Sequence, residues 1–175
     1  MKWSDVVSAG YEGVLRTLER TLDGLAEDDL NWQPSPDCNS IGWLAWHLTR
    51  VQDGLIASLM GEEQLWIKDG WHAKFGRPAD ARDSGSGHTP QDLAEFKSPD
   101  AATLLDYHRA VLERSRRYFP TLSEADLDKE VSGLPFQPPP KVGMMINLVL
   151  SDGLQHVGQV AYIRGLRQGM GWQKF

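Results

Sequence analysis

Cysteine is nearly absent from this sequence: Cys38 is the only one among 175 residues. No disulfide can form within the chain, which fits a reducing compartment. Long apolar runs are absent too, since no stretch approaches the roughly 20 apolar residues that a membrane span requires. Residues 1–20 contain acidic side chains and no continuous apolar segment, unlike a signal peptide. We therefore expect a soluble, cytoplasmic protein with no membrane partner.

Positive charge is also scarce. The chain has 18 Lys and Arg residues against 24 Asp and Glu residues, and its formal net charge is −6. A general nucleic-acid-binding protein normally carries a basic patch or stripe. The nearest candidate is the short cluster Arg114, Arg116 and Arg117, which we interpret as a solvated helix face. The composition thus argues against nucleic acid as a partner.

Strand-like alternation is rare, whereas helical spacing recurs in four stretches of the chain. A length of 175 residues fits a single domain, residues 1–175, that can bury roughly 70% of its unfolded surface. Apolar side chains keep the helical period over residues 4–22, 40–60, 98–119 and 143–168. The sequence therefore predicts an all-α four-helix bundle, with a long loop between the second and third helices.

The predicted helix ends follow from local signals. Asn39 or Ser40 can cap the second helix, and Gly61 can end it. Ser98, followed by Pro99, is predicted to cap the third helix. The loop between these two helices, residues 61–98, is expected to be mostly irregular and to be functional, mobile or both. Its aromatic part can pack over one end of the bundle, and its Gly/Ser part is expected to be flexible. Its length permits a crossover connection.

The last predicted helix carries two polar residues on its apolar face. One stripe runs through Met145, Val149, Asp152, His156, Val160 and Ile163. Burying a carboxylate and an imidazole is costly unless each has a strong partner. One interpretation is a hydrogen-bonded pair at i,i+4 without a metal. The other is a divalent metal, for which both groups are good ligands.

The second predicted helix has the same feature at His47. Its apolar stripe runs through Leu44, His47, Val51, Leu55 and Leu59. If the two stripes face each other, His47 meets Asp152 and His156, which together offer two nitrogens and one oxygen. Catalytic zinc sites typically have three protein ligands and a fourth position for water or substrate. These three residues are therefore candidate metal ligands, and the metal-free hydrogen-bonded pair remains the alternative.

Two segments also resemble a known family. The runs Ser40-Ile41-Gly42-Trp43-Leu44-Ala45-Trp46-His47-Leu48 and Asp152-Gly153-Leu154-Gln155-His156-Val157-Gly158-Gln159 resemble the DinB-like superfamily. More narrowly, they are similar to its actinobacterial branch related to the mycothiol-dependent maleylpyruvate isomerase metal-binding domain. The resemblance spans nearly the whole chain. It implies a four-helix bundle with a divalent metal, zinc or nickel, held by His47, Asp152 and His156.

The resemblance also implies a chemistry. Three histidines are common in the family, whereas the mycothiol-linked isomerases have a glutamate at the second place, where this chain has Asp152. The implied activity is a metal-dependent S-transfer or isomerisation between a low-molecular-weight thiol, such as mycothiol, and a small electrophile, by a transferase or isomerase. The alternative is a non-catalytic, stress-related metal-binding protein. A third hypothesis is a metal-free bundle that works by protein association. A homodimer through a helix face fits all three hypotheses.

Three further residues are candidates for substrate binding. Trp46 adjoins His47 and can line a pocket rim, although packing is the alternative. Arg50 can meet an anionic substrate or form a surface ion pair. Gln159 can hydrogen-bond near the site or support helix packing. No residue stands out as a general base, so no catalytic residue is assigned.

The remaining histidines and the cysteine are weaker candidates. We expect His72 to have a surface or packing role, His88 to be solvated and His108 to be structural. Cys38 precedes a predicted helix N-terminus, which can lower a thiol pKa. Since it lies well before His47, we expect any reactive thiol to come from a cosubstrate.

Overall fold

The structure is a computed structural model that describes residues 1–134, 136–169 and 171–173. Within these residues the protein is all-helical, as predicted, and the only bridge between extended segments is an isolated one joining Glu130 and Lys141. No helix in the described part of the chain is both long enough and apolar enough to span a membrane.

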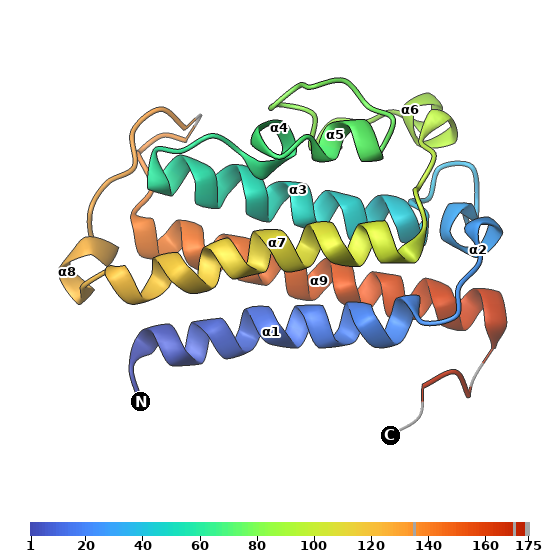
Figure 1. The fold of residues 1–175 in the computed structure, drawn as a ribbon, viewed down its shortest axis with the longest axis horizontal. Coiled ribbons are helices and arrows are strands. Elements are labelled where there is room, and N and C mark those ends of the chain that lie inside the picture. Colours follow the sequence, from blue (N-terminus) through green and yellow to red (C-terminus); the bar gives the residue numbers. More distant parts are fainter. Residues whose placement is uncertain (135, 170, 174–175) are drawn as a thin grey trace.

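Four long helices form the body of the molecule (Figure 1). They are α1 (Trp3–Leu22), α3 (Ile41–Met60), α7 (Ala101–Tyr118) and α9 (Val142–Gln168). Short helices occupy the connections: α2 (Glu27–Asn31), α4 (Leu65–Lys68), α5 (Trp71–Lys74), α6 (Pro90–Glu95), the 3-10 helix η1 (Phe119–Thr121) and α8 (Glu124–Leu127).

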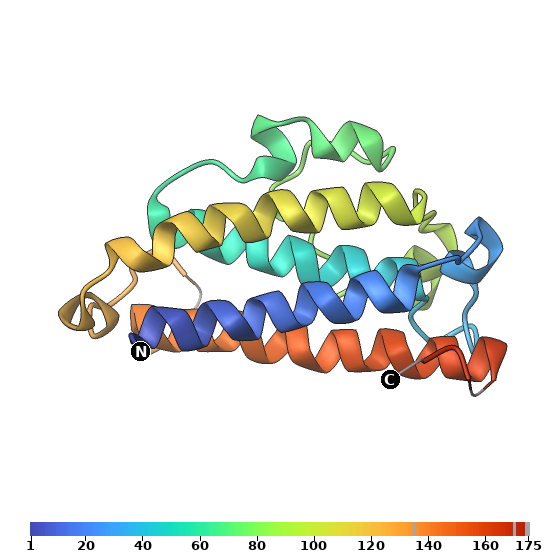
Figure 2. The same ribbon diagram turned by 60° about the horizontal axis from the view of Figure 1, so that its bottom comes forward.

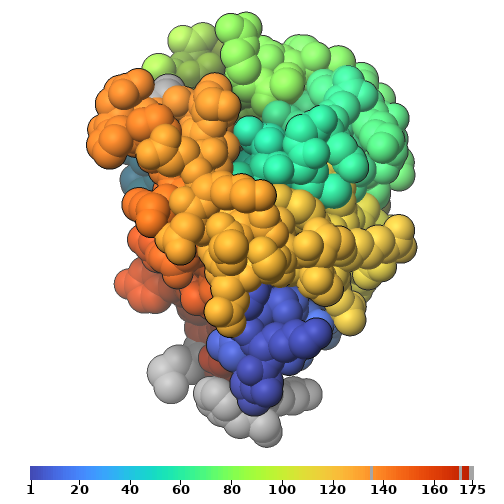
Figure 3. Space-filling view, turned by 90° about the vertical axis from the view of Figure 1, so that its left-hand side faces the viewer, coloured from blue at the N-terminus to red at the C-terminus, as the bar shows by residue number. Residues whose placement is uncertain are grey.

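The long helices pack side by side, with α1 and α3 each in contact with both α7 and α9. Figures 1 and 2 show that α1 and α9 run in one direction and that α3 and α7 run in the other. Two consecutive helices, α3 and α7, are therefore parallel, and the connection through α4, α5 and α6 carries the chain back along the molecule. Figure 3 looks onto the end where α8 meets the start of α9.

Local signals set the bounds of α3. The Ser40 side chain accepts a hydrogen bond from the Trp43 backbone N–H (3.2 Å), which caps the first turn. Gly61 ends the helix in the left-handed conformation, with φ of 66°. His47 therefore lies in the second turn of a well-defined helix.

The third long helix begins later than predicted. Asp100, not Ser98, caps α7, because its side chain accepts the Thr103 backbone N–H at 2.7 Å. Ser98 is buried against α3, and its backbone N–H donates to the Asn31 side chain (2.8 Å). The predicted cap was wrong because Ser98 and Asp100 are both suitable cap residues two positions apart. Ser98 is instead engaged by Asn31, which is distant in sequence.

The connection after α3 is irregular outside α4, α5 and α6, as predicted, and its aromatic part is packed. Its aromatic side chains Trp66, Trp71, Phe75 and Phe96 belong to the main apolar core, together with Trp46 of α3. Because this connection covers α3 on one side and α7 and α9 cover it on others, every residue from Ile41 to Arg50 is buried. The first half of α3 therefore lies within the protein, and so does His47.

Candidate metal centre

His47 is held in a defined orientation on α3. Its side chain is 8% exposed, and its ring stacks on that of Trp43 with centroids 4.7 Å apart. The Nδ1 atom of His47 makes a short hydrogen bond to the backbone carbonyl of Ser84. Because a carbonyl can only accept, Nδ1 carries the hydrogen and Nε2 is left with a free lone pair. His47 thus offers Nε2 as a ligand.

Asp152 and His156 come from successive turns of α9. The Nε2 atom of His156 lies 3.3 Å from Oδ1 of Asp152, and both side chains are about one-fifth exposed. The Nδ1 atom of His156 lies 2.7 Å from Oε1 of Gln159, which accepts its hydrogen. This contact leaves Nε2 of His156 directed at Asp152. A partner that fixes the far ring nitrogen is typical of metal-binding histidines.

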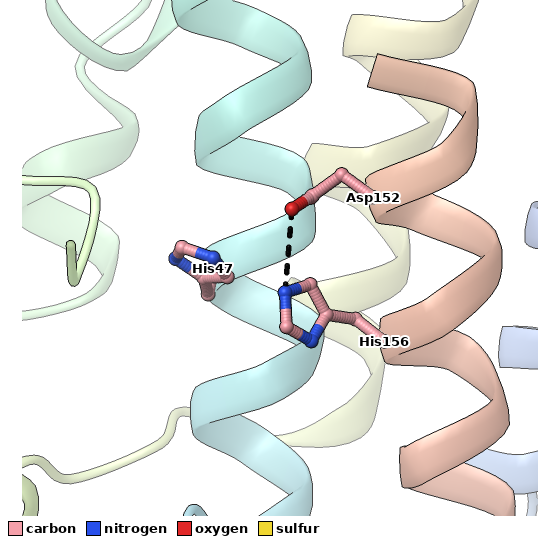
Figure 4. A group of neighbouring side chains, drawn as sticks. All are labelled: His47, Asp152 and His156. Atoms are coloured by element: carbon pink, nitrogen blue, oxygen red, sulfur yellow. Dashed lines mark ion pairs between the residues drawn. The ribbon is translucent and has the colours of Figure 1, made fainter. Parts of the chain in front are cut away.

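The two helices bring the three side chains to one place (Figure 4). The potential ligand atoms of His47, Asp152 and His156 all lie within 4.8 Å of one another. The two imidazole rings meet edge to face, with centroids 4.8 Å apart. Two atoms bound to one tetrahedral ion at about 2.1 Å lie roughly 3.4 Å apart, close to the distance between Asp152 and His156.

Asp152 supplies an independent indication that the group suits a cation. Its Oδ2 atom is buried and has no hydrogen-bond partner among the described residues. Leaving a buried carboxylate oxygen unpaired is unfavourable, and buried polar atoms are generally satisfied. A divalent ion between the three side chains would satisfy it. The donor set of two nitrogens and one carboxylate oxygen suits zinc or nickel.

The two histidines differ in their protonation. Burial lowers the pKa of His47, and the neighbouring His156 lowers it further, while the Ser84 carbonyl and Asp152 act in the opposite direction. The hydrogen bond to Asp152 raises the pKa of His156, with burial opposing this. His47 is therefore the neutral member. His156 with both ring nitrogens protonated forms an ion pair with Asp152, and a metal ligand must first lose the Nε2 proton.

Comparisons with known proteins agree with this fold. Residues 11–160 match the family model described as the DinB superfamily. The chain belongs to the DinB superfamily. A search of curated proteins gave no match. Among solved structures, the chain is similar to one titled "Crystal structure of the conserved protein of locus from Enterococcus faecalis", with 27% identity and a TM-score of 0.86. That match covers 95% of this chain and 97% of the other.

Superfamily membership and the His47–Asp152–His156 cluster together fit divalent-metal binding. Gln159, one of the predicted substrate-binding residues, contacts the cluster through His156 and is exposed. It is therefore positioned to orient a ligand and to face solvent.

The structure does not bring Trp46 or Arg50 into the cluster of His47, Asp152 and His156. Trp46 is fully buried and packs against Trp43, Trp66 and Phe96. Arg50 is 1% exposed, and its guanidinium donates to backbone carbonyls of Ala81 and Asp83. Both lie under the connection that covers α3. Neither is accessible to a substrate at the cluster, and the surface ion pair suggested for Arg50 is instead a buried one with Asp53.

The other histidines are packed. The prediction that His88 is solvated is wrong. Its side chain is 15% exposed, it accepts a hydrogen bond from Trp43 Nε1 (3.1 Å), and its ring stacks on that of Trp46. His108 is fully buried and donates to the Thr49 hydroxyl (3.0 Å). His72 lies 3.3 Å from the Arg77 carbonyl. Cys38 is half-buried, beside Ser35.

Sequence reasoning missed Ser84 and Trp43, which orient His47. Ser84 acts through its backbone carbonyl, so its side chain gives no signal of this role. Trp43 lies one turn before His47, and that spacing allows the stacking contact but does not distinguish it from core packing.

Proposed function

We propose that this member of the DinB superfamily binds one divalent ion, with zinc preferred and nickel as the second candidate. The protein uses this ion to activate a low-molecular-weight thiol. The ligands are Nε2 of His47, Nε2 of His156 and the carboxylate of Asp152. One observation carries the proposal: three donor atoms from α3 and α9 converge within 4.8 Å of one another beside an unpaired carboxylate oxygen.

The roles of the chain's own residues follow from their contacts. Ser84 and Gln159 hold the Nδ1 hydrogens of His47 and His156, so that both Nε2 atoms remain available. Asp152 faces Nε2 of His156 at 3.3 Å, where it pairs with the protonated ring in the metal-free protein, and it would be a ligand when an ion is bound. Its reach suffices for a site shared with His156, although aspartate is one methylene shorter than the glutamate of the mycothiol-linked enzymes.

A divalent ion held by His47, Asp152 and His156 would leave a position for an exogenous thiol and would lower the pKa of that thiol, which would make it a usable nucleophile near neutral pH. The resemblance of the helix motifs to the mycothiol-dependent isomerase branch favours this use of the open position. The expected reaction is S-transfer to, or isomerisation of, a small electrophile. Cys38 has no part in it, because the thiol belongs to the cosubstrate.

Metal titration of the chelator-treated protein tests the first half of this proposal. Wild type is expected to take up one equivalent of zinc or nickel, whereas His156→Ala loses stoichiometric uptake. Gln155→Ala is the matched control, since Gln155 lies on the same helix, is exposed and bonds only to Ser151. Uptake by His156→Ala equal to that of wild type would show that the ligands are wrongly assigned.

Turnover tests the second half. The loaded protein is incubated with mycothiol or bacillithiol and a generic aromatic electrophile, and thioether formation is followed with and without chelator. Metal-dependent turnover that is absent in His156→Ala supports the thiol-dependent enzyme. Metal binding without turnover for any such pair supports the non-catalytic alternative.

A further inference from the structure

The metal centre adjoins a buried charged cluster that the proposed function does not use. Asp53 is fully buried and accepts hydrogen bonds from the Leu65 and Trp66 backbone N–H groups (3.0 and 2.8 Å) and the Tyr107 hydroxyl (2.7 Å). Arg114 donates to Asp53 at 2.5 Å, and Arg50 lies 3.5 Å from it. Two arginines thus share one carboxylate.

Arg50 differs from Arg114 in where its remaining donors go. Its Nε donates to the Asp83 carbonyl (2.9 Å), and its Nη2 donates to the Ala81 carbonyl (3.2 Å). The next carbonyl along the chain, that of Ser84, accepts the Nδ1 hydrogen of His47. Arg50 lies three residues after His47 on α3. One helix therefore carries both the metal ligand and the side chain that anchors the segment orienting that ligand.

The same segment is held against α3 at Gly85. This residue has φ of +87°, and a Cβ atom there would lie 2.6 Å from Trp43 and 2.9 Å from Trp46. Only glycine allows this backbone to approach the two tryptophans so closely. Arg77 also bonds the Asp83 carboxylate (2.7 Å). Anchors on both sides of Ser84 therefore fix where its carbonyl points.

The geometry points to Arg50 as a positioning residue of the metal centre, which acts by holding residues 81–84 so that the Ser84 carbonyl fixes the orientation of His47. The inference rests on the proposed metal binding. It names a residue, Arg50, on which the affinity for the metal ion depends. Removing a partner that orients a metal-binding histidine typically weakens metal binding about 10- to 100-fold. Arg50 touches neither metal nor substrate, so it is not a catalytic residue.

Arg50→Met tests this role, with Arg114→Met as the matched control. Methionine keeps an unbranched apolar stem beside Trp66, over which the Arg50 guanidinium lies at 4.5 Å, but removes every donor. Arg114→Met breaks the other ion pair of Asp53, while its contacts to Glu63 and Asp53 do not involve residues 81–84. The zinc dissociation constant of each folded variant is measured by competition with a chromophoric chelator. Arg50→Met should raise it, at most by the roughly 10- to 100-fold that loss of a direct orienting partner causes, and Arg114→Met should leave it near the wild-type value.

A second pair of variants covers the case in which an arginine variant does not fold. Gly85→Ala should push the Ser84 carbonyl away from His47 and weaken zinc binding. Gly87→Ala has a similar positive φ of +84° but no atoms within 4 Å of an added Cβ, so it shares the backbone strain without the displacement. Zinc affinity should fall in Gly85→Ala alone.

The ring-nitrogen chemical shifts of His47 in the metal-free protein give a readout that a loss of stability alone does not change. Wild type and Arg114→Met should show hydrogen on Nδ1, whereas Arg50→Met and Gly85→Ala should show a mixture of tautomers. Wild-type affinity in Arg50→Met and Gly85→Ala would overturn the positioning role and leave the metal site standing. Equal weakening in Arg114→Met would overturn it too. No zinc uptake by wild type would overturn the proposed function itself.

Discussion

In the proposed metal site, a proton and a metal ion would compete for His156. Its Nδ1 hydrogen is fixed by Gln159, and its Nε2 faces Asp152 at 3.3 Å. The ion pair with Asp152 raises the pKa of His156. The metal-free and metal-loaded states therefore differ by one proton at one atom.

Metal binding should depend on pH in a defined direction. Below the raised pKa of His156 the ion must displace a proton, so the apparent affinity should fall about tenfold for each pH unit. Above that pKa the dependence should flatten, until other groups titrate. Titration calorimetry in buffers of different ionisation enthalpy counts the protons released. One proton per ion is expected below the pKa of His156, and binding without release at every pH would contradict the assignment of Nε2 as the ligand atom.

His108 gives a second expectation at this scale, concerning stability. Burial lowers the pKa of His108 to about 4, against about 6.5 in the unfolded chain. Between these values the unfolded state binds more protons, so stability that is complete above pH 6.5 is lost as the pH falls towards 4. The shift corresponds to about 3 kcal/mol. Urea unfolding of metal-free wild type and His108→Leu across this range should show the acid-dependent loss in wild type and a smaller loss in the variant. Parallel curves would exclude His108 as the source.

At the scale of elements, the long helices could be predicted, whereas the packing of residues 61–98 could not. Caps and the helical period are local signals, so α1, α3 and α9 begin and end within about two residues of expectation. The structure of residues 61–98 depends on contacts distant in sequence, such as Trp66 with Tyr107 and Arg50 with Asp83. The same division holds for the site. Side-chain periodicity predicted that His47, Asp152 and His156 could meet, and the fold brings them together, whereas the backbone contact from Ser84 left no pattern.

The contact between α3 and the segment before α7 should be sensitive to one methyl group. A Cβ atom on Gly42 would lie 2.3 Å from Ser98, so Gly42→Ala must displace one segment and should cost about 1–3 kcal/mol. Gly158→Ala on α9 is the control, because an added Cβ there meets nothing within 4 Å and alanine favours helix by about 0.5–1 kcal/mol. Denaturant unfolding of the metal-free proteins measures both. Equal stability of the two variants would show that the α3 contact is not rigid.

At the scale of the whole molecule, α9 exposes an apolar face beside the metal centre. Met144, Leu148, Tyr162 and Leu166 are 39% to 69% exposed and lie on one side of the helix. They are arranged symmetrically about Gln155, and Asp152 is the only Asp, Glu, Lys or Arg between residues 144 and 163. A two-fold dimer needs a surface that complements itself. Antiparallel packing of two α9 helices would pair Met144 with Leu166 and Leu148 with Tyr162.

We propose that this face forms a homodimer. Sedimentation analysis should give a dimer for wild type and a monomer of unchanged helicity for Leu148→Glu, because the charge cannot be paired in an apolar contact. Val6→Glu is the control, since Val6 is an equally apolar exposed residue (58%) on α1. The Val6→Glu variant should therefore remain a dimer. A wild-type monomer at micromolar concentration would rule out the arrangement.

The central claim is that side chains from α3 and α9 converge on a single cation. Anomalous diffraction at the zinc edge, from crystals grown with one equivalent of zinc, tests it most directly. We expect one strong peak within bonding distance of His47 Nε2, His156 Nε2 and a carboxylate oxygen of Asp152. Zinc bound elsewhere, or a peak that leaves His47 uncoordinated, would contradict the account.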